Sequence, residues 1–114
     1  MRTIRVPSGS PVLLGAPARP LDAALARSLG SLATSIQGVK EAHLPECFLM
    51  GVMEAPAQVL VVVHVPEIGV KEIERELDEG LRRLLPPGME LDVWSIPYDH
   101  PLLQDIRSTG CQIP

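Results

Sequence analysis

Residues 58–66 read Q-V-L-V-V-V-H-V-P, and this stretch decides the fold. Its four odd-numbered positions from 59 to 65 are all valine, and the even-numbered Leu60 and Val62 are also apolar. β-Branched residues favour the extended conformation. A strand without a polar side is covered on both faces. We therefore predict that this stretch is the central strand of a sheet.

The composition indicates one ordered globular domain. The chain has 114 residues, which suffices for a single compact core. Its share of hydrophobic residues, 46%, is too high for a disordered chain. The net charge is −4 and the basic residues are scattered. Since nucleic-acid binding requires clustered Lys and Arg, we expect no nucleic-acid partner.

The sequence also argues against membrane insertion and secretion. No apolar run approaches the roughly 20 residues that a membrane span needs, and none behind residues 1–7 has the length of a signal peptide. Cys47 and Cys111 lie far apart and form no C-x-x-C pair. We expect a soluble cytoplasmic protein with reduced thiols. A single Cys47–Cys111 bridge stays open at this point.

Two segments have the periodicity of amphipathic helices. Between residues 21 and 36, Leu and Ile recur at three- and four-residue spacing, with Pro20 as the expected first helical residue and Gly38 as the stop. Residues 70–84 form a second apolar stripe, with acidic side chains early and arginines late. That order suits the helix dipole.

Four extended segments alternate with these helices: residues 12–15, 39–53 with an edge position or a bend at Pro45, 58–66 and 89–96. The order strand, helix, strand, strand, helix, strand predicts an α+β fold of the ferredoxin-like βαββαβ type. We expect an antiparallel four-stranded sheet with both helices on one face and the first and third strands central.

We expect a single domain over residues 1–114. It consists of an N-terminal segment (1–10), a βαββαβ core (11–97) and an irregular C-terminal tail (98–114) with at most one helical turn, at residues 102–106.

One face of this predicted sheet lacks a cover. The helices pack on one side only, whereas the central strand is apolar on both. A second subunit, the tail or a ligand should cover the other side, and we expect a homodimer or the tail, because exposed apolar patches usually mark interfaces. The candidate interface residues are Leu60, Val62, Trp94 and Ile96.

Metal binding has little support in the sequence. His43 and His64 lie on strands that we expect to pair, and Cys47 is close to His43. A closed site needs a fourth ligand, and none stands at a diagnostic spacing. We therefore predict no metal.

Catalysis has little support either. The tail holds Asp99, His100, Asp105 and Ser108, which are residue types of a hydrolytic triad. A triad also needs a nucleophile on a rigid turn and an oxyanion hole, and the G-x-S-x-G motif is missing. We therefore predict no catalytic residues.

The loop from Gly15 to Pro20 is the remaining candidate for a ligand. It leads into a helix start, which is a common anion site, and the candidate residues are Gly15, Arg19 and Leu21. The glycine-rich nucleotide motifs are missing from the chain. We therefore expect no cofactor, and a small ligand has no other support.

Several segments resemble the C-terminal domain of the enhanced-serine-sensitivity (SseB-type) family. They are V-L-L-G-A-P (12–17), V-K-E-A-H-L (39–44), Q-V-L-V-V-V (58–63) and L-L-P-P-G-M-E-L-D-V (84–93). The chain departs from the family in lacking an additional N-terminal domain and in residues 109–114. The resemblance implies a bacterial cytoplasmic protein with no recognised catalytic residue.

Our leading hypothesis is a non-enzymatic binding or protein-interaction module that dimerises through the open face of its sheet. The alternative is a regulatory domain that senses an amino acid or another small ligand near residues 15–21. An enzyme ranks third, because no pair of titratable groups occupies a position that folding alone would not explain.

Overall fold

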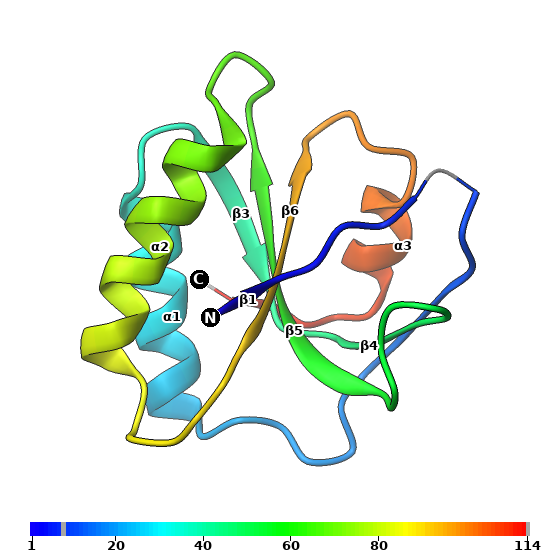
Figure 1. The fold of residues 1–114 in the computed structure, drawn as a ribbon, viewed down its shortest axis with the longest axis horizontal. Coiled ribbons are helices and arrows are strands. Elements are labelled where there is room, and N and C mark those ends of the chain that lie inside the picture. Colours follow the sequence, from blue (N-terminus) through cyan, green and yellow to red (C-terminus); the bar gives the residue numbers. More distant parts are fainter. Residues whose placement is uncertain (8, 114) are drawn as a thin grey trace.

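The computed structural model describes residues 1–7 and 9–113. Figure 1 shows three layers, with α1 and α2 on one side of a central sheet and α3 on the other. The elements in chain order are β1 (Arg2–Thr3), β2 (Val12–Gly15), α1 (Ala23–Ser35), β3 (Val39–His43), β4 (Glu46–Leu49), β5 (Ala57–His64), α2 (Val70–Leu84), β6 (Asp92–Pro97), α3 (Leu103–Ser108) and β7 (Gln112–Ile113).

Strand β5 is the centre of the sheet, as predicted. The strands lie in the order β1-β6-β5-β3-β7, and β4 pairs with both β5 and β2. β3 runs antiparallel to β5, whereas β6 runs parallel to β5 along the register from Val59–Asp92 to His64–Pro97. The expected α+β class is confirmed, but the sheet that the described residues form is mixed and has seven strands, not four antiparallel ones.

The ferredoxin-like order fails because β2 is not a central strand. A central strand must bury both faces, but β2 has only four residues and its Leu13 is 63% exposed. β2 pairs with β4 instead, and the last strand, β6, takes the place beside β5. β6 also starts later than predicted, at Asp92.

The predicted bend at Pro45 is confirmed, and it divides one long strand into two. β3 ends at His43 and β4 begins at Glu46, while the Pro45 carbonyl accepts a 3.0 Å hydrogen bond from the Val59 N–H. Before the bend, β3 pairs with β7; after it, β4 pairs with β2. We call the β2–β4 pair, with the turn of residues 50–56 that follows it, the lobe.

Both faces of β5 are covered within the chain. Leu60 and Val62 pack in a core with α1 and α2. Val59, Val61 and Val63 pack in a second core, whose members Ile4, Leu103 and Ile106 come from the N-terminal segment and α3. The tail that we expected to be irregular therefore forms α3 and β7, and it helps to cover the second face.

The two long helices follow their sequence signals, with one correction. α1 begins at Ala23 and not at Pro20, because the Asp22 carboxylate caps it and accepts hydrogen bonds from the Ala24 and Leu25 N–H groups at 3.0 and 3.2 Å. Gly38 follows α1 with a φ of 93°, as expected of a stop signal. α2 spans the predicted residues 70–84. Among the described residues, no helix is long and apolar enough to cross a membrane.

Gly38 allows a test of the packing between the end of α1 and the loop before α2. A Cβ at Gly38 would lie 2.6 Å from Ile68 Cγ1, whereas Gly88, with a φ of 81°, has nothing within 4 Å. A left-handed backbone costs a residue other than glycine about 1–2 kcal/mol. We expect Gly38→Ala to lower the free energy of unfolding by more than the matched control Gly88→Ala, as measured by urea denaturation. Equal losses would show that Ile68 does not limit this position.

Candidate functional site

The lobe exposes several large hydrophobic side chains. Opposed residues share a face, so Leu14 and Cys47 pack together in the second core. Leu13 lies opposite Phe48, which is half-buried and packs against the same core. Leu13 is 63% exposed, and Met50 and Val52 in the following turn are 55% and 41% exposed. We call Leu13, Phe48, Met50 and Val52 the lobe surface.

Two hollows meet at the end of β2. One, of about 210 Å³, lies on the lobe and includes Leu13, Glu46, Phe48 and Pro56 in its lining. The other, of about 480 Å³, separates β2 from α3, and we call it the β2–α3 groove. It is lined by Leu14, Gly15, Ala16, Asp105, Ser108 and Thr109.

Gly15 contributes to both hollows. It lines each of them, and a Cβ built on it would meet nothing within 4 Å. Because its φ is not in the left-handed region, the backbone does not require glycine here. Glycine at this position therefore leaves space open at the surface.

The charge around these hollows is negative. Glu46 lines the smaller hollow and Asp105 lines the β2–α3 groove. In the described part of the chain, neither carboxylate forms an ion pair. The nearby Arg107 is already bound to Glu41. The site therefore favours a positively charged or neutral occupant.

A charged cluster fastens α3 to the sheet. Arg107 of α3 donates hydrogen bonds to both carboxylate oxygens of Glu41, one of them 3.1 Å long, and the Glu41 carboxylate is 2.9 Å from His43 Nε2. The hydrogen bond from Arg107 is the main reason why the pKa of Glu41 is lowered. The His43 side chain is fully buried, so no substrate reaches it. The cluster is a structural clamp.

The residues considered for a metal site are not brought together. His43 and Glu41 lie on the face of the sheet that α3 covers. His64 lies on the opposite face, on the same side of β5 as Leu60 and Val62. Among the described residues, no three potential ligands form a group.

Cys47 and Cys111 are both free, and burial, aided by Cys111 and Glu46, raises the pKa of Cys47 to about 12. Cys47 is therefore a packed thiol and not a nucleophile.

The tail residues considered for a triad have structural roles. His100 Nδ1 accepts a 3.1 Å hydrogen bond from the Leu102 N–H, and its ring meets Trp94 edge to face at 5.7 Å. Ser108 Oγ donates to the Gln104 carbonyl. His100 thus holds the chain at the entrance to α3. Asp105 and Ser108 line the β2–α3 groove instead of forming a triad.

Of the three residues predicted for the anion loop, Gly15 lines a hollow, whereas Arg19 and Leu21 do not line the same hollows. The Leu21 N–H donates to Gln58 Oε1 at 3.1 Å, and the Asp22 carboxylate occupies the start of α1. A negative group at this helix start opposes a second anion. Arg19 is exposed, but it does not line the groove, whereas Gly15 does.

The four predicted interface residues are not available to a second subunit. Leu60 and Val62 are completely buried in the first core, while Trp94 and Ile96 are buried in the second. They lie on opposite faces of the sheet, and the chain itself covers both. The prediction of dimerisation through these side chains is therefore wrong, because the tail and the N-terminal segment occupy the face that we expected to be open.

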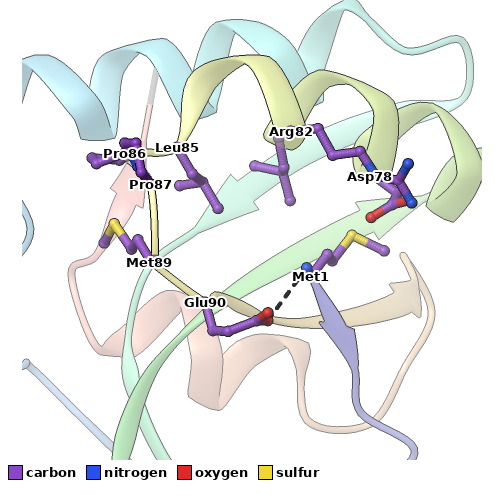
Figure 2. Close-up of a pocket in the computed structure, with 10 residues that line it drawn as sticks. Met1, Asp78, Arg82, Leu85, Pro86, Pro87, Met89 and Glu90 are labelled. Atoms are coloured by element: carbon purple, nitrogen blue, oxygen red, sulfur yellow. Dashed lines mark ion pairs between the residues drawn. The ribbon is translucent and has the colours of Figure 1, made fainter.

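A further hollow lies between the end of α2 and the N-terminal residue (Figure 2). It measures about 430 Å³. Its charged groups are paired: Arg82 with Asp78 at 2.9 Å and the Met1 amine with Glu90 at 3.4 Å. A charged ligand would have to displace one of these pairs, so this hollow is a weaker candidate than the β2–α3 groove.

Comparison with known proteins gives no further guide, since no family model, no curated protein and no solved structure matches the chain.

Sequence reasoning missed the lobe surface and the clamp. Leu13 looked like part of a buried strand, although the prolines at positions 11 and 17 already limit that strand to a short one. Glu41 and His43 stand two residues apart, which places them on one face of a strand. Arg107 comes from the distant tail, so its place in the clamp had no signal in the sequence.

The role of His100 predicts a pH dependence of stability. Burial lowers the pKa of His100 from its usual value of 6.5, although Asp99 partly opposes the shift. The stabilisation is complete above pH 6.5 and is lost as the pH falls through the lower pKa of the folded state. We expect His100→Asn, whose amide oxygen can still accept from Leu102, to lose less stability than wild type between pH 7.5 and pH 5. Parallel losses in urea denaturation would refute this role.

Proposed function

We propose that this protein is a non-enzymatic protein-interaction module that binds its partner through the lobe surface. The observation that carries the proposal is the concentration of exposed apolar side chains in the lobe. Among the described residues, four large hydrophobic residues are exposed: Leu13, Met50 and Val52 belong to the lobe, and Tyr98 lies elsewhere. Grouped apolar exposure marks interaction sites, whereas single exposed residues need no explanation.

The titratable groups support a binding role rather than catalysis. Glu41 and His43 belong to the clamp, His100 caps the entrance to α3, and the pKa of Cys47 is raised, not lowered. A catalytic site needs groups that can reach a substrate with a useful pKa.

Membership of the SseB-type family and a location in the cytoplasm belong to the same proposal. The free thiols of Cys47 and Cys111 agree with a reducing compartment.

A sensor of amino acids has less support. The β2–α3 groove is large enough for a small molecule, and Asp105 would suit an ammonium group. Among the described residues that line the groove, none is a cation that would hold a carboxylate. An amino acid needs both partners, so the groove fits a positively charged segment better than a zwitterion.

Leu13→Asp tests the proposed surface. Leu13 is 63% exposed, so the variant should fold with a change in stability within about 0.5 kcal/mol. A charge on the apolar surface should abolish partner binding. Tyr98→Asp is the matched control, because Tyr98 is 50% exposed and lies outside the lobe. The measurement is the recovery of phage-displayed random peptides selected on immobilised wild type.

We expect the selected phage to bind wild type and Tyr98→Asp equally and Leu13→Asp at background level. Equal recovery on all three proteins would place the binding surface outside the lobe and contradict the proposal.

A further inference from the structure

Building on the proposed function, we propose that the partner binds as an extended strand along the free edge of β2, in the β2–α3 groove. Its chemistry is that of a segment of another protein in which apolar residues alternate with Lys or Arg. Three features of the described residues support this partner class and this mode of binding.

The first feature is the unpaired edge of β2. In the described structure, β2 pairs with β4 and with no other strand. Outside that ladder, no hydrogen bond involves the backbone of residues 12–16. An edge strand with free N–H and C=O groups is a template for an added strand, and natural proteins usually guard such edges with charges. β2 reads V-L-L-G and has no charge, so its protection is limited to its short length and the flanking Pro11 and Pro17.

The second feature is the hollow between the end of β2 and α3. The last turn of α3 stands opposite Leu14, Gly15 and Ala16, and the groove between them measures about 480 Å³. Gly15 has no side chain to fill it, and a Cβ there would find open space. Figure 1 shows α3 and the lobe on the same side of the central sheet. An added strand would thus lie between the β2 backbone and a helix.

The third feature is charge. Side chains of an added strand point alternately to opposite faces. One set would meet the lobe surface, where Leu13 and Phe48 are apolar and Glu46 is negative. The other set would meet Asp105. Because neither carboxylate has an ion-pair partner in the described chain, basic residues on the added strand would complement both.

The same charge argues against a second copy as the occupant. The protein has a net charge of −4. In a pairing of β2 with β2, the acidic residues beside each strand would lie near their own copies, and like charges placed close together across an interface are unfavourable.

The experiment uses the peptides selected on immobilised wild type and two further variants. Asp105→Lys reverses the charge of one groove wall at an exposed position, and Gly15→Val places a side chain in the open space without backbone strain. Circular dichroism confirms the fold of each. We expect selected sequences rich in Lys and Arg alternating with apolar residues, and binding to Asp105→Lys weakened by about tenfold. Gly15→Val should bind at background level.

A direct readout of strand addition is hydrogen exchange. With one selected peptide bound, the amides of residues 12–16 should exchange more slowly, because they gain partners. The same peptide carrying N-methyl groups on alternate amides should neither bind nor protect them, because it cannot form the ladder.

The outcomes separate the two proposals. If binding depends on Leu13 but not on Asp105, Gly15 or the peptide amides, the lobe surface stands and strand addition falls. Selected peptides without basic residues would also overturn the inference. A wild-type dimer in light scattering that Leu13→Asp converts to a monomer would identify a second copy as the occupant and overturn it. Selection of no peptide above background would overturn both proposals.

Discussion

The architecture depends on the burial of β5 on both faces. Because valine and leucine occupy both sides of this strand, each side must be removed from water, and the gain is about 25 cal/mol for each Å² of apolar surface that is buried. α1 and α2 cover Leu60 and Val62. The opposite side recruits segments from both ends of the chain, with Ile4 from one end and Ile106 from the other. The segments outside the predicted core of residues 11–97 are therefore part of the fold and not appendages.

The elements with strong local signals were predictable, and the pairing of strands was not. The stripe of α2, the double-sided β5 and the bend at Pro45 each follow from a few neighbouring residues. The position of β2 depends on competition between distant segments for the edges of β5, where β6 pairs at six positions and β3 takes the other edge. Element order alone could not decide that competition. The predicted ferredoxin-like topology was therefore wrong, although both long helices were predicted correctly.

The candidate site was predictable only in fragments. Gly15 was chosen for its place before a helix, but it matters because it lines a groove with α3. Asp105 and Ser108 were considered for chemistry and instead form the groove wall. Trp94 and Ile96 were correctly predicted to be on a face that needs a cover, but the cover is the chain itself. A surface made by two segments that are 90 residues apart becomes visible only after folding.

The clamp between Glu41 and Arg107 has a consequence for recognition. Arg107 and Asp105 belong to the same short helix, so the contact that fastens α3 to β3 also fixes one wall of the β2–α3 groove. Since the pKa of Glu41 is lowered, the carboxylate stays ionised and the contact stays intact throughout the neutral range. In the proposed binding mode the groove would thus be preorganised, and the entropy cost of binding would fall mainly on the incoming segment. Selectivity would then depend on how readily a partner segment adopts an extended form before it arrives.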